Sequence, residues 1–179
     1  MSAEKLLRDK NGKVRGVALH DRSLLDGKTF KANAKVVINA TGPWSDILRK
    51  ELNVPDRLRP LRGSHLIFSH SRLPVSEAVT FFHPADKRAM FIIPWEGTTL
   101  VGTTDIDHSG KEFQAGGEPF ANRDEIAYIL QGIEFLFPIA KITEKDILSS
   151  FAGLRPVINT GAATPSKESR AHQVWEEKG

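Results

Sequence analysis

Apolar residues alternate with polar ones in several short runs near the start of the chain. The dipeptides Asn11-Gly12 and Asp26-Gly27 separate these runs, and both are typical of tight turns between antiparallel strands. The first segment is therefore expected to be a small antiparallel meander, with β-strands over residues 5–8, 14–21 and 28–32.

A second pattern covers residues 35–52. Residues 35–40 are almost continuously apolar, which predicts a strand that is buried on both faces, as in a parallel sheet. The triplet Thr41-Gly42-Pro43 follows and predicts the start of a helix, because proline suits the first helical position. The apolar face of that helix would consist of Trp44, Ile47, Leu48 and Leu52.

From residue 59 onward the pattern favours strands. A hairpin turn is expected at Trp95-Glu96-Gly97, and the polar, glycine-rich residues 109–121 are expected to form a loop. One helix is predicted after Asn122, because Asn122 and Glu125 have the spacing of a capping box and an apolar stripe continues to Pro138. The predicted strands cover residues 61–70, 78–83, 90–95, 98–104 and 146–158. These elements predict an α+β fold with a predominantly antiparallel or mixed sheet and packed helices.

The composition narrows the possible chemistry. The chain has 179 residues, 40% of them hydrophobic, which is enough for one sizeable core or for two small lobes that share one. Lys and Arg number 25 against 22 Asp and Glu, and they are scattered, so nucleic acid is not suggested as a partner. The absence of cysteine excludes disulfides, thiolate catalysis and cysteine-ligated metals. Redox chemistry would therefore need an organic cofactor.

Neither a membrane span nor a metal site is expected. No apolar run approaches the roughly 20 residues that cross a bilayer, so a cytoplasmic setting is the default expectation. His65 and His70 are five residues apart on a predicted strand, and alternation sends them to opposite faces. They are therefore not expected to share a metal ion.

Two glycine-containing stretches are candidates for binding. The small residues Ala40, Thr41 and Gly42 would let a ligand approach the backbone closely, although on spacing alone an ordinary tight strand-to-helix connection is the more common explanation. His65 follows Gly63 in a strand, and a strand glycine often marks the close approach of a ligand. With an ordinary pKa of about 6.5, His65 could accept a proton; a histidine satisfied by a backbone carbonyl is the alternative.

Arg155 is the third candidate. It ends an apolar strand, and alternation places it on the same face as Phe151. A guanidinium beside apolar surface needs an anionic partner. The partner could be a substrate phosphate or carboxylate, or one of the chain's own acids.

Four stretches, taken together, resemble a known family: VVINATGPWSD, RPLRGSHLIF, FIIPWEGTTLVGTTD and SSFAGLRPVI. In this order and spacing they resemble the FAD-dependent glycerol-3-phosphate dehydrogenases, within the D-amino-acid-oxidase-like flavoenzyme superfamily. The similarity covers most of residues 12–165. It implies oxidation of sn-glycerol 3-phosphate to dihydroxyacetone phosphate, hydride transfer to FAD, and quinone as the electron acceptor. Such an enzyme could be peripheral on the inner face of the membrane.

The resemblance also implies roles for particular residues. Ala40, Thr41 and Gly42 match a strand end that runs beside the FAD, with Trp44 close behind. His65 matches a histidine that faces the flavin and could take the proton of the substrate hydroxyl. Arg155 matches an arginine that engages the substrate. The stretch from Gly102 to Asp105 matches a family signature to which the sequence assigns no chemical role.

Two departures from the family pattern limit what the chain alone is expected to do. It lacks the initial Gly-x-Gly-x-x-Gly turn that holds the FAD pyrophosphate, and it lacks the later glycine-rich segment that closes over the flavin. The chain is therefore interpreted as an internal fragment that is inactive alone and binds FAD weakly or not at all. Its expected parts are a partial FAD-binding domain (1–56), a substrate-binding sheet and helix (57–145), and a return strand with a tail (146–179).

Two other interpretations stay open from the sequence. An amino-acid or sarcosine-type oxidase of the same superfamily would use Arg155 to hold a carboxylate. A non-catalytic domain could instead keep the fold and bind a partner protein.

Overall fold

The computed structural model describes residues 1–23, 27–108 and 118–177. By its contacts the chain divides into two compact units. Unit 1 comprises Met1–Leu58, Val157–Thr160 and Ser169–Gly179, and unit 2 comprises Arg59–Pro156 and Gly161–Glu168. None of the helices in the described part of the chain combines the length and apolarity needed to cross a bilayer.

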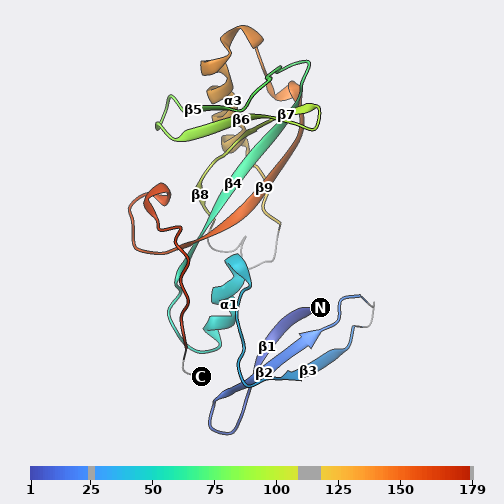
Figure 1. The fold of residues 1–179 in the computed structure, drawn as a ribbon, viewed down its shortest axis with the longest axis vertical. Helices are drawn as coiled ribbons and strands as arrows, with labels where there is room; N and C mark the ends of the chain where they lie inside the picture. Colours follow the sequence, from blue (N-terminus) through green and yellow to red (C-terminus); the bar gives the residue numbers. More distant parts are fainter. Residues whose placement is uncertain (24–26, 109–117, 178–179) are drawn as a thin grey trace. The chain divides into compact units, whose positions relative to one another are not determined.

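Unit 1 begins with the predicted antiparallel meander (Figure 1). Its strands are β1 (Ser2–Arg8), β2 (Val14–His20) and β3 (Thr29–Asn33), paired in the order β1-β2-β3. The first turn closes where expected, because the backbone N–H of Gly12 donates to the carbonyl of Asp9 at 2.9 Å. Asp26 of the second predicted turn lies outside the described residues.

The strand predicted over residues 35–40 is not present. These residues form no strand ladder, and Val36 and Ile38 are 75% and 85% exposed. An apolar run becomes a buried strand only when other strands pair with its edges and other elements cover its faces. The described residues supply neither to this run, so the prediction of burial on both faces was wrong.

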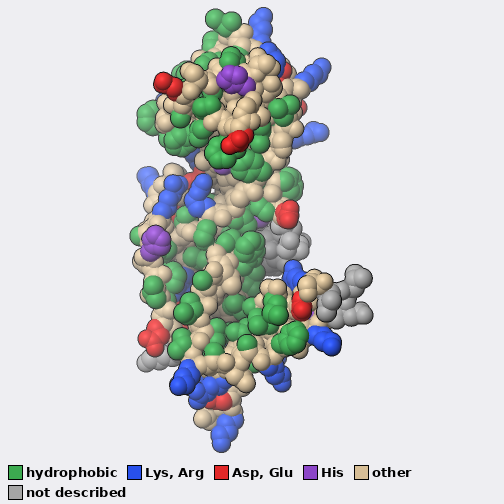
Figure 2. All heavy atoms as spheres, turned by 45° about the vertical axis from the view of Figure 1, so that its right-hand side comes forward, with side chains coloured by type: hydrophobic (Ala, Val, Ile, Leu, Met, Phe, Trp, Pro, Cys, Tyr) green, Lys and Arg blue, Asp and Glu red, His purple; other side chains and the backbone are tan. Residues whose placement is uncertain are grey.

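A helix follows at the predicted place, but its apolar face is not its buried face. A 3-10 turn η1 (Gly42–Trp44) leads into α1 (Ser45–Lys50). Trp44 and Ile47 are about half exposed, whereas Asp46 and Arg49 are buried. Large hydrophobic side chains are widespread on the molecular surface shown in Figure 2.

Polar contacts hold α1 in unit 1. The side chains of Asp46 and Arg49 form an ion pair within the helix. Asp46 also accepts hydrogen bonds from the backbone N–H groups of Arg57 and Leu58 at 2.9 and 2.8 Å. Arg49 donates in addition to Glu177 at 2.8 Å. Charged residues that the apolar pattern places on the solvent side therefore anchor this short helix.

Unit 2 is built on a six-stranded sheet (Figure 1). The strand order is β5-β6-β7-β4-β8, and β9 also pairs with β4. The pairs β4–β7, β4–β8, β5–β6 and β6–β7 are antiparallel. The strands are β4 (Leu58–Ser69), β5 (Val79–Phe82), β6 (Ala89–Trp95), β7 (Thr98–Gly102), β8 (Ile106–Asp107) and β9 (Ile147–Ile158). This architecture confirms the α+β prediction.

The hairpin between β6 and β7 has the predicted turn. Trp95 pairs with Thr98, so only Glu96 and Gly97 form the loop. Both loop residues have positive φ, at 47° and 76°. Two positive φ values in succession match the right-handed twist of the flanking strands, which is why such loops favour tight antiparallel pairing.

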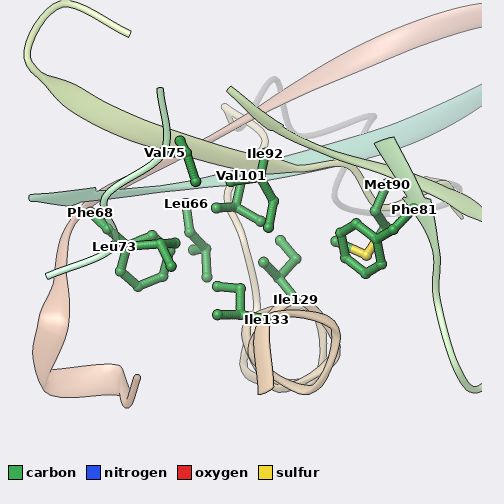
Figure 3. Packing of buried hydrophobic residues seen from close by; sticks show 10 residues of the cluster. All are labelled: Leu66, Phe68, Leu73, Val75, Phe81, Met90, Ile92, Val101, Ile129 and Ile133. Carbon is green, nitrogen blue, oxygen red and sulfur yellow. The ribbon is translucent and has the colours of Figure 1, made fainter. Parts of the chain in front are cut away.

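Helix α3 (Arg123–Leu136) covers one face of the sheet and supplies much of the core. The predicted capping box is present, since Asn122 accepts from the backbone N–H of Glu125 and Glu125 accepts from that of Asn122. Ile129 and Ile133 are fully buried against the strands, as Figure 3 shows. The remaining buried members of this core are Leu66, Phe68, Leu73, Val75, Phe81, Met90, Ile92 and Val101.

The other regular elements are short. Within the predicted loop, residues 109–117 lie outside the described part of the chain, and 118–121 have no regular structure. The remaining elements are the 3-10 turns η2 (Pro138–Ala140), η3 (Glu144–Asp146) and η4 (Pro165–Lys167).

Candidate active site

Strand β4 presents different chemistry on its two faces, because successive side chains of a strand point to opposite sides. Ser64 and Leu66 are fully buried on the face that packs on α3, where Ser64 bonds to Glu125. Gly63 and His65 belong to the opposite face. There β9 contributes the side chains of Phe151 and Arg155. The structure therefore brings two sequence-predicted site residues, His65 and Arg155, to one face of the sheet in unit 2.

The imidazole of His65 is held by its two neighbouring strands. It stacks on the ring of Phe151 from β9, with centroids 4.8 Å apart and an interplanar angle of 10°. On β7 the register pairs His65 with Gly102. A Cβ atom at position 102 would lie 2.3 Å from Cδ2 of His65, so only glycine leaves room for the ring there. The orientation of the imidazole is thus set by an aromatic contact and by the absence of one side chain.

His65 is poised to be neutral near neutral pH. Burial lowers the pKa of His65, and the positive charge of Arg155 lowers the pKa further. Its Nδ1 atom is buried and has no hydrogen-bond partner among the described residues. A backbone carbonyl therefore does not satisfy this nitrogen in the described part of the chain. A neutral imidazole has one nitrogen that can accept a proton, so His65 has the protonation state that a general base requires.

Arg155 is paired with an acid of the same unit. Its Nη1 atom donates to Oδ1 of Asp105 at 2.6 Å. The side chain of Asp105 is only 4% exposed, whereas that of Arg155 is 33% exposed. The second terminal nitrogen, Nη2, lies 3.1 Å from the place that a Cβ atom on Gly63 would occupy. The guanidinium therefore lies against β4 at Gly63, two positions from His65 on the same face.

The segment from Gly102 to Asp105 connects this face to the interior. Thr104 accepts a hydrogen bond from the backbone N–H of Ser64 at 2.9 Å and donates to Glu125 at 2.7 Å. The hydroxyl of Thr103 donates to the carbonyl of Thr104 at 3.1 Å, and the peptide bond between Gly102 and Thr103 is cis. Asp105 follows this anchored threonine directly. The segment from Gly102 to Asp105, to which the sequence assigns no chemical role, therefore holds Asp105 in place, and Asp105 is the acid that pairs with Arg155.

Glu125 gathers the buried polar groups on the helix side. Its carboxylate accepts from the hydroxyls of Ser64 and Thr104, both at 2.7 Å, and from the backbone N–H of Asn122 at 3.1 Å. Arg62 forms an ion pair with it at 2.9 Å. Burial alone would raise the pKa of Glu125, but these hydrogen bonds together lower its pKa below the usual value. Glu125 is therefore an ionised, fully paired carboxylate.

The predicted cofactor-contact residues lie in unit 1. Gly42 has a positive φ of 61°, and a Cβ atom there would meet nothing within 4 Å. Thr41 donates from its hydroxyl to the side chain of Asn39 at 2.8 Å. Ala40 and Thr41 are exposed, and Trp44 is 47% exposed. The backbone from Ala40 to Gly42 is thus open to close approach, within the part of the chain that is described.

The open backbone at these residues leaves space for part of an extended cofactor. Exposed small residues and a glycine suit lateral contact with an extended cofactor, because no side chain stands in its way. The pyrophosphate needs a glycine-rich turn at the start of a longer helix, and the sequence contains no Gly-x-Gly-x-x-Gly. Helix α1 has only six residues. The described backbone from Ala40 to Gly42 is therefore open enough for a cofactor to lie beside it, but the sequence offers no glycine-rich turn for a pyrophosphate.

Several residues of the site are not evident from sequence patterns. Gly102 and Asp105 owe their importance to the pairing of β4 with β7 and β8, which no local pattern predicts. Glu125 is recognisable as a capping residue, but its contacts with Ser64 and Thr104 require the tertiary fold. Within the described ranges, no group of three or more His, Asp or Glu side chains is arranged to hold a metal ion.

A comparison with protein-family models identifies the class of protein that has this architecture and site. The family model of FAD-dependent oxidoreductases matches residues 2–170. The chain belongs to this family of flavoenzymes.

The relatives give a more particular likeness. The chain is 40% identical over 174 residues to the aerobic glycerol-3-phosphate dehydrogenase of Bacillus subtilis (strain 168), covering 96% of this chain and 30% of the relative. It is 37% identical over 172 residues to the enzyme of the same name from Staphylococcus haemolyticus, covering 95% of this chain and 30% of that one. The chain thus spans about 30% of the length of these relatives.

Solved structures show the same likeness. The glycerol-3-phosphate dehydrogenase from Bacillus halodurans, complexed with FAD, superposes with a TM-score of 0.78 at 38% identity, over 88% of this chain and 31% of that chain. A glycine oxidase from Bacillus cereus shares the fold, with a TM-score of 0.58 at 21% identity over 90% of this chain and 39% of its own.

Proposed function

We propose that this chain is the central part of an FAD-dependent glycerol-3-phosphate dehydrogenase, which oxidises sn-glycerol 3-phosphate to dihydroxyacetone phosphate. The observation that carries the proposal is the placement of His65 and Arg155 on one partly exposed face of the sheet, with the buried Nδ1 of His65 unpartnered among the described residues. The names of the relatives support this choice of substrate.

His65 serves as the base of the reaction. Oxidation of a secondary alcohol breaks the O–H and C–H bonds and forms a carbonyl. FAD, when bound, supplies the acceptor for the hydride. The proton of the hydroxyl passes to the imidazole of His65, whose lowered pKa keeps it in the neutral, accepting form.

Arg155 serves as the substrate anchor. Its planar guanidinium can donate hydrogen bonds to a phosphate oxygen or to the developing carbonyl oxygen. Ala40, Thr41, Gly42 and Trp44 would lie along the FAD in the assembled enzyme. Quinone is the proposed final electron acceptor, with the enzyme in the cytoplasm or peripheral on the inner face of the membrane.

Flavin binding by the chain alone is the first test. Because the sequence offers no glycine-rich turn for the pyrophosphate, the purified chain of 179 residues is expected to bind FAD weakly or not at all. A visible spectrum recorded after incubation with FAD and gel filtration measures this. A stoichiometric flavin band near about 450 nm would contradict the expectation.

Substitution of His65 in the full-length enzyme is the second test. His65→Ala is expected to lower kcat/KM for glycerol 3-phosphate by about 10²- to 10⁴-fold, because the proton loses its acceptor. His70→Ala is the matched control, since His70 is exposed just beyond the end of β4. An unchanged kcat/KM in His65→Ala would rule out His65 as the base.

Assays of the wild-type enzyme with glycine and sarcosine separate the proposed substrate from that of an amino-acid oxidase.

A further inference from the structure

We propose that Asp105 is a positioning residue that holds Arg155 in place for the substrate. This inference rests on the proposed function for its catalytic meaning, although the positioning itself is independent of the substrate. It gives the segment from Gly102 to Asp105 a role that the sequence does not suggest.

Arg155 and Asp105 are in direct contact. Nη1 of Arg155 and Oδ1 of Asp105 are 2.6 Å apart, a short charge-assisted hydrogen bond. The Asp105 side chain is almost fully buried, while one third of the Arg155 side chain is exposed. A long side chain near solvent has many rotamers, and a buried carboxylate at its tip selects among them. Asp105 is therefore the immobile member of the pair, and it holds the side chain of Arg155 in position.

The residues on both sides of Asp105 hold its backbone in place. The preceding residue, Thr104, is buried and bonded to Ser64 and Glu125. The following residue, Ile106, pairs with Arg62 in the contact between β8 and β4. The backbone on both sides of Asp105 is thus tied to the interior of unit 2. Its carboxylate has a defined position from which to direct a partner.

The guanidinium of Arg155 lies next to Gly63 of β4. A Cβ atom on Gly63 would be 2.7 Å from Oγ1 of Thr103 and 3.1 Å from Nη2 of Arg155. The glycine thus leaves room for Arg155 to rest against the backbone of β4. Among the described residues, Nη2 makes no hydrogen bond to a protein group. Asp105 consequently holds one nitrogen and leaves the other available to a substrate oxygen.

A second arginine–aspartate pair shows what a purely structural pair looks like. Arg59 donates to both carboxylate oxygens of Asp107, at 2.5 and 2.7 Å. Its Nη1 atom donates to Glu168 at 2.9 Å and to the carbonyl of Ala162 at 2.7 Å. All three guanidinium nitrogens of Arg59 are therefore used within the protein. Asp107 is two residues from Asp105, so it also offers a matched control.

The kinetic experiment uses the full-length enzyme with glycerol 3-phosphate. Asp105→Asn is expected to lower kcat/KM by about 10- to 100-fold, because a misplacement of about 1 Å is enough for such a loss. Asp107→Asn is expected to change it by less than about threefold. In an Arg155→Lys background, Asp105→Asn should cost less than about threefold, since the group it positions is already altered. An equal loss in both backgrounds, or no loss in the wild type, would overturn the proposal.

A measurement without turnover tests the same inference. In the chain of 179 residues labelled with ¹⁵N-arginine, the Nε–H signal of Arg155 is assigned by its absence in Arg155→Lys. Asp105→Asn is expected to lower its order parameter below about 0.6, while Asp107→Asn leaves it unchanged. An Arg155 signal that stays ordered in Asp105→Asn would overturn the proposal.

Two further outcomes are separable. If Asp105→Asn does not fold, Asp105→Glu takes its place, because the longer acid keeps the charge but moves the guanidinium; unchanged kcat/KM and order in that variant contradict the proposal. If the wild-type full-length enzyme does not oxidise glycerol 3-phosphate, the proposed function fails. The NMR comparison then still decides whether Asp105 positions Arg155.

Discussion

The two faces of strand β4 carry similar polar residue types, but these residues differ in how far the protein itself satisfies their hydrogen bonds. On the helix side, Ser64 and the guanidinium of Arg62 meet the fully buried carboxylate of Glu125. On the open side, His65 and Arg155 lie next to each other with one nitrogen each, Nδ1 and Nη2, that makes no hydrogen bond within the described protein.

The difference separates groups that hold the fold from groups that can act on a ligand. Burying a carboxylate without partners is costly, and the carboxylate of Glu125 is buried together with two hydroxyls, a backbone N–H and a guanidinium that pair with it. This carboxylate therefore has little capacity left for a ligand. By contrast, Nη2 of Arg155 makes no hydrogen bond to a described protein group and is free to donate one to a ligand. The same strand thus contributes to stability on one side and to chemistry on the other.

The largest effect is expected from breaking the helix-side cluster. Glu125→Gln removes the charge that Arg62 requires and disturbs the acceptor of two hydroxyls, so it should reduce the free energy of unfolding by about 3–5 kcal/mol. Urea denaturation of the chain measures this. Glu134→Gln, on an exposed position of the same helix, is expected to stay within about 0.5 kcal/mol of the wild type. A loss below about 1 kcal/mol for Glu125→Gln would remove the contrast between the faces.

A smaller effect is expected on the open face. Gly102→Ala places a methyl group 2.3 Å from Cδ2 of His65, so the ring must move away from β7. The overpacking should cost about 1–3 kcal/mol in the free energy of unfolding and shift the NMR signals of the imidazole. Gly153→Ala on β9 is the control, because a Cβ atom there meets nothing within 4 Å. Equal behaviour of the two variants would show that Gly102 does not set the ring orientation.

The smallest effect concerns the titration of His65. Its pKa is lowered in the folded chain, so the unfolded chain binds the proton more readily as the pH falls. The contribution of His65 to stability is therefore complete above about pH 6.5 and is lost as the pH falls from there through the folded pKa.

Removing the nearby charge tests the cause of that shift. Arg155→Gln should raise the pKa of His65 only part of the way to its ordinary value, because burial is the larger cause and Arg155 the smaller. NMR titration of the imidazole measures this, with Arg59→Gln as the control for loss of a paired arginine in the same unit. A pKa unchanged in Arg155→Gln would show that the two side chains do not interact.

Local patterns predicted the elements whose cause is local. Helix α3 starts at its predicted cap because Asn122 and Glu125 satisfy each other's backbone N–H groups. The β6–β7 hairpin turns at Glu96 and Gly97 because a tight loop requires positive φ there. Alternation along β9 also placed Arg155 on the same face as Phe151, and the structure brings both to the face of β4 that carries His65.

The failures have non-local causes. Residues 35–40 have the composition of a buried strand, but burial depends on neighbours that the described residues do not provide. Helix α1 buries Asp46 and Arg49 because their partners lie outside the helix: Arg57 is 11 residues from Asp46, and Glu177 is 128 residues from Arg49. Asp105 could not be found from its surroundings in the sequence, since its partner is 50 residues away.

The capping box of α3 has a consequence for how unit 2 folds. Glu125 closes the first helical turn through Asn122, yet the same carboxylate binds Ser64, which is 61 residues earlier in the chain. The start of the helix and the middle of β4 therefore acquire their final hydrogen bonds in one event. Before β4 docks, water solvates this carboxylate, so its buried and fully paired state forms only when the helix and the strand come together.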